Sequence, residues 1–151
     1  MSSSGVDAAR RNGGDLPSST RLLLVPCDAT IARAATEERW RLPELLGREV
    51  DDDWPSGDLL EMLPIYADGL ETHPELLRWG LYLIVERASG RVVGDIGFKG
   101  PPDEEGGVEI GYGVVPGRRG RGYATEAVDA LVAWAGRRPE VREVRAFCSA
   151  T

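Results

Sequence analysis

Reactive and metal-binding side chains are scarce in this chain of 151 residues, which contains two cysteines and one histidine. Cys27 and Cys148 show no metal-ligand spacing, and two thiols cannot form a disulfide framework. We expect both thiols to be reduced and at least half-buried, which is consistent with the cytoplasm. His73 lies at an expected helix end, where a surface role is favoured over that of a catalytic base. The sequence therefore predicts no metal site and no Ser-His-Asp or Cys-His catalysis.

Long apolar runs are also absent. No segment approaches the roughly 18–20 apolar residues that cross a bilayer, and the N-terminus lacks the hydrophobic segment of a secretory signal. A net charge of −7 and a pI near 4.8 argue against general nucleic-acid binding. The same acidity is compatible with attraction of a cationic amine and with simple solubility, and composition does not separate the two. We expect a cytoplasmic globular protein with neither a membrane nor a nucleic acid as partner.

Length and patterning predict one folded domain. Residues 1–19 are rich in Ser, Gly and Asn, which predicts a disordered tail before a domain over residues 20–151. Strands are expected at residues 20–25, 79–87, 92–99, 108–115 and 141–150. Helices are expected from an N-cap at Asp28 to about residue 47, over 58–70 as two pieces broken near Pro64, and over 124–135. The glycines within residues 92–99 indicate a bulge or close packing.

The order of these elements predicts a mixed α/β fold. The strands at 79–87, 92–99 and 108–115 form a meander of antiparallel neighbours. The strand at 108–115 reaches the one at 141–150 through a loop and a helix, so these two should be parallel, with a right-handed crossover. We therefore expect a mixed, mostly antiparallel sheet flanked by helices.

The segment from Val108 to Gly136 carries the strongest functional signal. Pro116 stops its strand, and residues 117–124, G-R-R-G-R-G-Y-A, place three arginines before the helix. Glycines let the backbone approach a ligand, and the first-turn N–H groups and dipole of a helix favour an anion. A basic loop in an acidic chain predicts a pyrophosphate site. The alternative is a tight strand-to-helix turn with solvated arginines.

Known pyrophosphate patterns narrow the choice. The pattern G-x-x-x-x-G-K-[ST] is absent, and G-x-G-x-x-G, started at Gly120, fails at its last position, Thr125. The pattern R-x-x-G-x-A does fit, with Arg119, Gly122 and Ala124.

With these residues the chain resembles the GNAT superfamily of acyl-CoA-dependent N-acetyltransferases, whose coenzyme A loop is [Q/R]-x-x-G-x-[G/A]. The flanking runs E-I-G-Y-x-V-x-P and G-Y-A-T-E-A, between Glu109 and Ala127, resemble the branch that contains the ribosomal-protein-alanine N-acetyltransferases. The resemblance implies a GNAT-like fold with a parallel strand–helix–strand core that binds acyl-CoA.

The resemblance also implies acetyl-CoA as cosubstrate and direct attack by a primary amine, either a protein N-terminus or a small molecule. In that family a kink splays the central strand from the next one and frees backbone groups for the pantetheine arm. The resemblance assigns cofactor binding to the backbone of Val114 and Val115 and to the loop residues Arg119, Gly120, Arg121, Gly122, Tyr123, Ala124 and Thr125.

Glu109, at the start of the central strand, is the first candidate for the general base, because some superfamily members carry a glutamate there. A partly desolvated cleft would raise its pKa toward the working range. The alternative for Glu109 is a structural carboxylate, and Asp95 on the adjacent strand is the second candidate. Trp40, Trp54 and Tyr66 are candidates for the wall of the amine site, with core packing as their alternative.

The resembling family continues beyond the strand at 141–150 with a segment that often supplies a cofactor contact and a tyrosine as general acid. Measured against that pattern, the chain lacks the usual C-terminal part. A second hypothesis is therefore a non-catalytic acyl-CoA-binding module, and a third is a nucleotide-binding domain that uses the same loop. The strand ending in Phe147, Cys148 and Ser149 would be an open apolar edge, through which we expect a homo-oligomer.

Overall fold

The structure is a computed structural model that describes residues 16–148, with Phe147 and Cys148 described by their backbone. The strands are β1 (Leu22–Pro26), β2 (Leu81–Glu86), β3 (Arg91–Phe98), β4 (Gly107–Val114) and β5 (Glu143–Cys148). The helices are α2 (Ala29–Glu37), α3 (Leu42–Leu46), α4 (Gly57–Thr72) and α5 (Tyr123–Gly136), with short 3-10 turns η1 (Arg39–Arg41), η2 (Pro74–Leu77) and η3 (Pro116–Arg118).

Two sequence predictions reach outside the described residues. Residues 1–15 of the expected tail lie outside them, as do Ser149 and Ala150 of the expected last strand. Residues 16–19 lie beside β1, where Ser18 forms an antiparallel bridge with Leu23.

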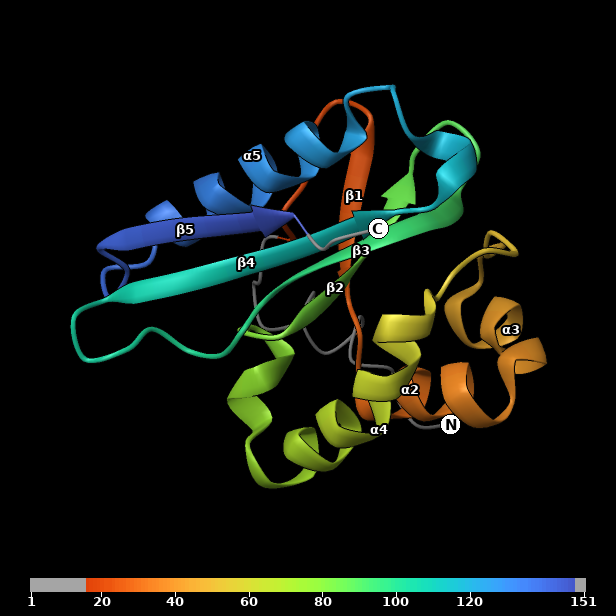
Figure 1. Cartoon of the computed structure of the whole chain (residues 1–151), viewed down its shortest axis with the longest axis horizontal. Coiled ribbons are helices and arrows are strands. Elements are labelled where there is room, and N and C mark those ends of the chain that lie inside the picture. Colours follow the sequence, from red (N-terminus) through yellow and green to blue (C-terminus); the bar gives the residue numbers. More distant parts are fainter. Residues whose placement is uncertain (1–15, 149–151) are drawn as a thin grey trace.

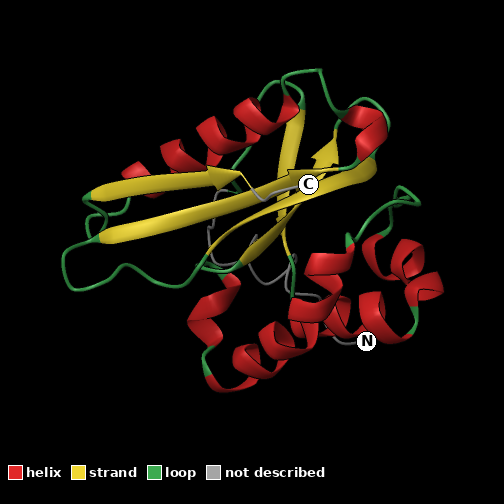
Figure 2. Ribbon diagram, in the orientation of Figure 1, coloured by secondary structure: helices red, strands yellow, loops and turns green. Residues whose placement is uncertain are grey.

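One five-stranded sheet, in the order β1-β2-β3-β4-β5, organises the molecule. Its first three pairs are antiparallel, and β4 pairs with β5 in parallel. Helix α5 covers one side of the sheet and α2, α3 and α4 lie on the other (Figure 1; Figure 2 shows the helices and strands by colour). The predicted mixed, mostly antiparallel sheet and its parallel strand–helix–strand unit are confirmed.

Helix α4 corrects a prediction. It runs unbroken from Gly57 to Thr72 with Pro64 inside it, so the expected break is wrong. Proline removes one backbone donor, but Pro64 is exposed, and water can reach the carbonyl that loses its partner. Leu63 is fully buried one residue earlier and fixes this turn of the helix against the core.

The first helical region is divided instead. Asp28 caps α2 as predicted, because its side chain accepts the N–H of Ile31 at 2.9 Å. The helix stops at Glu37, and η1 and α3 continue the path to Gly47, which ends α3 in the left-handed conformation with φ 65°. Pro43, in the first turn of α3, has no N–H to donate to the carbonyl four residues earlier, so an α-helical ladder cannot run from η1 into α3.

The predicted irregularity in β3 is a bulge. Val85 pairs with Val92 while the preceding Ile84 pairs with Gly94, so β3 carries one extra residue there. A Cβ on Gly94 would lie 2.4 Å from the carbonyl oxygen of Gly113, so β3 approaches β4 too closely for a side chain. The glycine thus brings β3 and β4 together beside the cleft described below.

Helix α5 is anchored at its C-terminal end by aromatic packing. The Trp134 ring lies 5.2 Å from that of Trp79 and 5.7 Å from that of Phe98, and the Arg138 guanidinium lies 4.1 Å above Trp134. The helix includes Gly136, one residue further than predicted. This anchoring directs the other end of α5, the arginine-rich turn, toward the end of β4 (Figure 1).

Candidate active site

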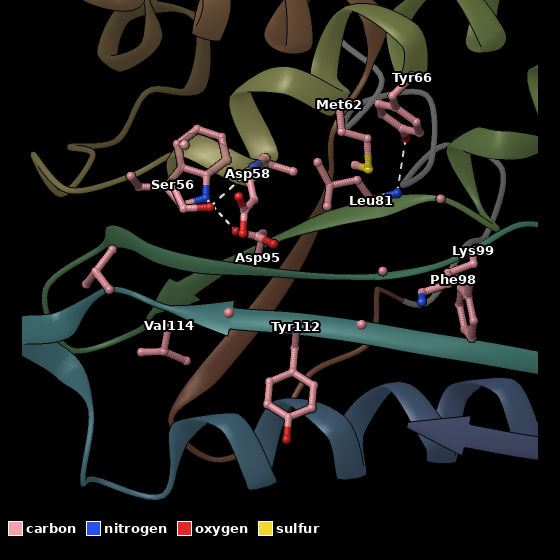
Figure 3. Close-up of a pocket in the computed structure, with 18 of the residues that line it drawn as sticks. Ser56, Asp58, Met62, Tyr66, Leu81, Asp95, Phe98, Lys99, Tyr112 and Val114 are labelled. Carbon is pink, nitrogen blue, oxygen red and sulfur yellow. Dashed lines mark hydrogen bonds between the residues drawn. The ribbon is translucent and has the colours of Figure 1, made fainter. Parts of the chain in front are cut away.

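A cleft of about 920 Å³ opens between α4 and the sheet. Its floor comes from β3 and β4, its wall from α4 and the loop before it, and one end from Val115, Pro116 and Arg119. In Figure 3, Asp58 and Asp95 point into the same space, whereas Tyr112 points to the side that α5 covers. The cleft therefore joins the turn singled out by the sequence to helix α4.

At this end of β4, one backbone position faces away from its neighbour β3. The Val115 N–H donates to the Val93 carbonyl at 2.9 Å, and hydrogen-bonded pairs alternate along an antiparallel ladder. Val114, which pairs with Gly94, thus directs its N–H and C=O away from β3. The described pairing with β5 ends at Tyr112 and Cys148, two residues earlier. Of the two backbone amides expected to meet the cofactor, that of Val114 faces away from β3 and that of Val115 is used within the sheet.

The turn before α5 has an open backbone. Gly120 and Gly122 are left-handed, with φ of 78° and 79°, and Gly122 is the N-cap of α5 without a side-chain cap. The first N–H groups of a helix have no intrahelical partners, and the exposed Thr125 lies in this first turn. A Cβ on Gly120 would meet nothing within 4 Å. The turn thus presents backbone donors to solvent.

The three arginines of the turn have different surroundings. Arg118 lies 3.3 Å from the buried carboxylate of Glu86, whereas Arg119 donates its Nε–H to the Val114 carbonyl at 2.9 Å. Arg121 is exposed. The turn therefore offers Arg119 and Arg121 to a ligand, while Arg118 pairs internally.

Glu86, which sequence reasoning missed, holds this turn to the sheet. It accepts the hydroxyl of Tyr123 at 2.6 Å and that of Ser89 at 2.6 Å. The hydrogen bonds from Ser89 and Tyr123, and the charge of Arg118, lower the pKa of Glu86. Because Arg118 and Tyr123 flank residues 119–122, Glu86 fixes both ends of that segment.

Arg21 is a second residue that the sequence did not indicate. Its guanidinium lies 4.6 Å above the Tyr123 ring and its Nε lies 2.7 Å from Glu126. These contacts place a fourth arginine beside the turn, from a position about 100 residues away in the chain. No local pattern could have found it.

The cleft is acidic beside this end of β4, where Asp95 pairs with Gly113. Asp53, Asp58 and Asp95 line it, from the loop before α4, from α4 and from β3. Asp95 is half-buried, and its Oδ2 accepts the indole N–H of Trp54 at 3.0 Å. Burial raises the pKa of Asp95 to about 6, against the opposing effect of the Trp54 hydrogen bond. This is a carboxylate that takes up a proton close to neutral pH.

The remaining candidates occupy different places. Glu109 is half-buried on β4, opposite Arg145 of β5, and is not among the residues that line the cleft. Trp54 and Tyr66 do line it, and the Tyr66 hydroxyl donates to the Cys27 carbonyl at 2.9 Å. Trp40 is 74% exposed and is neither core nor lining, contrary to both expectations for it.

His73 and Cys27 lie where the sequence predicts, at a helix end on the surface and in the interior. His73 is at the C-terminus of α4, 3.8 Å from Glu75, with 65% of its side chain exposed. Cys27 is a buried free thiol, and burial raises its pKa. Within residues 16–148, no group of three His, Cys, Asp or Glu residues could hold a metal ion. No helix in that range has the length and apolar character to span a bilayer.

Comparison with known proteins identifies the family. A family model described as an acetyltransferase (GNAT) domain matches residues 21–151. The chain belongs to the GNAT acetyltransferase family. This GNAT acetyltransferase is 32% identical over 128 residues to the uncharacterized N-acetyltransferase YjdG of Bacillus subtilis (strain 168), a match that covers 85% of this chain and 76% of the relative.

Solved GNAT structures share the fold. RimL, a ribosomal L7/L12 alpha-N-protein acetyltransferase in complex with coenzyme A, is similar with a TM-score of 0.55 and 20% identity, over 85% of this chain and 71% of that chain. The microcin C7 self-immunity acetyltransferase MccE, in complex with acetyl-CoA and AMP, is similar with a TM-score of 0.52 and 13% identity, over 82% and 67%. The family and fold predicted from R-x-x-G-x-A and its flanks are thus confirmed, and acetyl-CoA is the acetyl donor of this GNAT acetyltransferase.

Proposed function

We propose that this GNAT acetyltransferase transfers the acetyl group of acetyl-CoA to a primary amine, which attacks the thioester carbonyl directly. The observation that carries the proposal is the continuity of the cleft, which runs from Arg119 beside the open turn to Asp58 and Tyr66 on α4. A donor held at the turn and an amine entering past α4 would meet above Gly113 and Val114. Bringing two reactants together in this way is a large part of what such a reaction needs.

Coenzyme A suits the residues at the turn. The left-handed Gly120 and Gly122 leave a concave backbone, and the uncapped first turn of α5 offers N–H groups to a diphosphate. The exposed Arg121 would add charge. The Val114 backbone, directed away from β3, would pair with the pantetheine arm, in exchange for the present contact with Arg119. The thioester, when bound, supplies the electrophilic carbonyl.

The acidic part of the cleft suits an amine. Three carboxylates favour an ammonium ion at the entrance, and Leu59, Met62 and Ile65 supply an apolar wall. Both a protein N-terminus and a small-molecule amine remain within this class. RimL is named for a ribosomal-protein N-terminus and MccE for self-immunity to a microcin, and at their low identities neither name selects the acceptor.

The proposal is tested by following thiol release from acetyl-CoA with a panel of peptide and small-molecule amines. In parallel, thermal shifts with coenzyme A, NAD and ATP measure which diphosphate the turn prefers. We expect stabilisation by coenzyme A and amine-dependent thiol release. Binding of coenzyme A without thiol release from any amine would leave a non-catalytic acyl-CoA-binding module. A larger shift with NAD or ATP would support the nucleotide-binding alternative.

A further inference from the structure

Asp95 occupies a distinctive place in the cleft. It lies opposite Gly113 in the register of β3 and β4, next to the strand end where the donor carbonyl is expected. It lines the cleft and is half-buried, and no cation lies within ion-pair distance of it among residues 16–148. A carboxylate in such a position lowers stability unless it is protonated, so its presence indicates a chemical role.

Trp54 fixes this carboxylate from one side. Its side chain is 1% exposed, and its indole N–H donates to Oδ2 of Asp95 at 3.0 Å. Within residues 16–148, this is the one hydrogen bond that Asp95's side chain makes. The second oxygen, Oδ1, therefore remains available to a group in the cleft.

Arg39 in turn fixes Trp54. Its Nε and Nη2 donate to the Trp54 carbonyl at 3.0 and 2.8 Å, and Nη2 also donates to the Asp51 carbonyl at 2.7 Å. The Asp51 N–H donates to the Val92 carbonyl of β3 at 3.0 Å. The loop that carries Trp54 is thus tied both to η1 and to the strand that carries Asp95.

We propose that Asp95 is the proton acceptor of the transfer reaction, and that Trp54, held by Arg39, is a positioning residue that orients its carboxylate and sets its proton affinity. This inference rests on the proposed function and assigns the catalytic group within it. Glu109, the alternative, lies on β4 outside the lining of the cleft.

The proposed steps balance in protons and bonds. Oδ1 of Asp95 takes one proton from the entering ammonium, R–NH₃⁺, and leaves the neutral amine. The amine nitrogen then forms a bond to the acetyl carbon, and the carbon–sulfur bond of the thioester breaks. The second proton of the nitrogen passes to the departing sulfur, which gives the amide and the free thiol, and Asp95 returns its proton to water.

The surroundings of Asp95 determine how its titration is read. Charged groups that face the same cleft are Asp53, Asp58, Lys99 and Arg119, and the charges of Asp95 and Asp28 both act on the buried thiol of Cys27. Two causes act on the pKa of Asp95: burial raises it, and the hydrogen bond from Trp54 lowers it. A pKa of about 6, raised by burial, leaves Asp95 ionised at pH 7 and able to accept a proton.

The test compares the pH dependence of kcat/KM for wild type, Asp95→Asn, Glu109→Gln, Trp54→Phe, Arg39→Lys and the control Asp52→Asn, with one amine so that the ionisation of the amine cancels. Asp95→Asn should lower kcat/KM at pH 8 by about 100-fold or more and abolish the acid limb near pH 6. Trp54→Phe removes a hydrogen bond that favours the charged form, so its acid limb should move up by about one pH unit. Arg39→Lys should move the limb less in the same direction, and Asp52→Asn, an exposed carboxylate outside the cleft lining, should leave it unchanged.

A measurement that needs no turnover separates the assignment of Asp95 as proton acceptor from the proposed acetyl transfer. The ¹³C resonance of the Asp95 carboxyl, followed by NMR in the free protein, should titrate near pH 6 in wild type and at higher pH in Trp54→Phe. Loss of the acid limb in Glu109→Gln with its retention in Asp95→Asn would overturn the assignment while leaving the acetyltransferase intact. An Asp95 carboxyl that titrates near 4, or does not respond to Trp54→Phe, would overturn it too. Thiol release that fails with every amine would overturn the proposed function itself.

Discussion

The turn that precedes α5, which we call the donor end, and the carboxylates around Asp95, which we call the acceptor end, are built from different parts of the chain. The turn is one contiguous segment whose useful groups are backbone amides, exposed by Gly120 and Gly122. The acceptor end is assembled from side chains of three segments, with Trp54 and Asp95 41 residues apart. The comparison teaches that changes of backbone conformation should disable the first end, whereas side-chain changes at constant shape should disable the second.

Gly122→Val should break the donor end most severely. A β-branched residue is strained at φ 79°, a cost of roughly 1–2 kcal/mol, so the turn should leave its present shape. We expect acetyl-CoA affinity, measured by calorimetric titration, to fall about tenfold or more while circular dichroism shows a folded protein. Gly117→Ala is the matched control, because a Cβ there meets nothing within 4 Å. Equal affinity of Gly122→Val and wild type would show that the conformation of the turn is not what binds the cofactor.

Glu86→Ala should destabilise the donor end by removing the carboxylate that holds the turn to the sheet. It leaves the hydroxyl of Tyr123 without its acceptor, and we expect denaturant unfolding to show a loss of about 2 kcal/mol. Because hydrogen bonds lower the pKa of Glu86, its contribution is present at neutral pH and disappears as the pH falls through that lowered pKa. Acetyl-CoA affinity should fall with it. Glu140→Ala removes an exposed carboxylate and should change neither property.

Asp95→Asn, at the acceptor end, should raise the stability of the folded protein, whereas Glu86→Ala lowers it. The pKa of Asp95 is raised, so its ionised form destabilises the folded state above about pH 6, and this penalty vanishes on protonation toward pH 4. At pH 8 the free energy of unfolding should rise by roughly 1–2 kcal/mol, a value discounted because water reaches the cleft. The gain should shrink as the pH falls from 6 to 4. A variant less stable than wild type at pH 8 would contradict this, with Asp52→Asn as control.

Ser56→Ala should give the smallest effect. Ser56 caps α4 by accepting the Leu59 N–H at 3.3 Å, and loss of such a cap costs about 1 kcal/mol. Because α4 is the wall of the amine site, KM for the amine should rise slightly while acetyl-CoA affinity stays constant. Ser56→Thr, which keeps a hydroxyl, should restore both stability and KM. A change in acetyl-CoA affinity in Ser56→Ala would contradict the view that the donor and acceptor ends respond independently to mutation.

The same division explains what the sequence could predict. The strand β4, the turn and α5 are continuous in the chain, so glycine spacing and apolar periodicity were enough to place the start of the helix at Ala124, one residue from its observed start at Tyr123. The roles of Glu86 and Arg21 depend on contacts across the sheet, which no local pattern encodes. Proline's cost inside a helix predicted a break at Pro64, but burial of neighbouring Leu63 outweighs the lost backbone bond.

At the acceptor end the sequence indicated single residues and missed their relation. Trp54 was expected for its ring, and the structure adds a hydrogen bond from its indole N–H to Asp95. Asp95 was second to Glu109 because no pattern shows which carboxylate faces a cleft. Only the packing of the loop before α4 against β3 distinguishes them. The loop that carries Asp51 and Trp54 is held by hydrogen bonds from Arg39 to backbone carbonyls, and no sequence pattern predicts such bonds.

The hydrogen bond between Trp54 and Asp95 also makes the protein its own optical indicator. Trp40 is exposed and the rings of Trp79 and Trp134 pack edge to face, whereas the indole N–H of Trp54 donates to the carboxylate of Asp95 at 3.0 Å. Protonation of that carboxylate removes a negative charge beside the fluorophore, and the ultraviolet emission should therefore follow a titration curve centred near pH 6. Binding of an ammonium ion beside Asp95 would change the same emission. Amines could therefore be screened for binding by tryptophan fluorescence before any acetyl group is transferred.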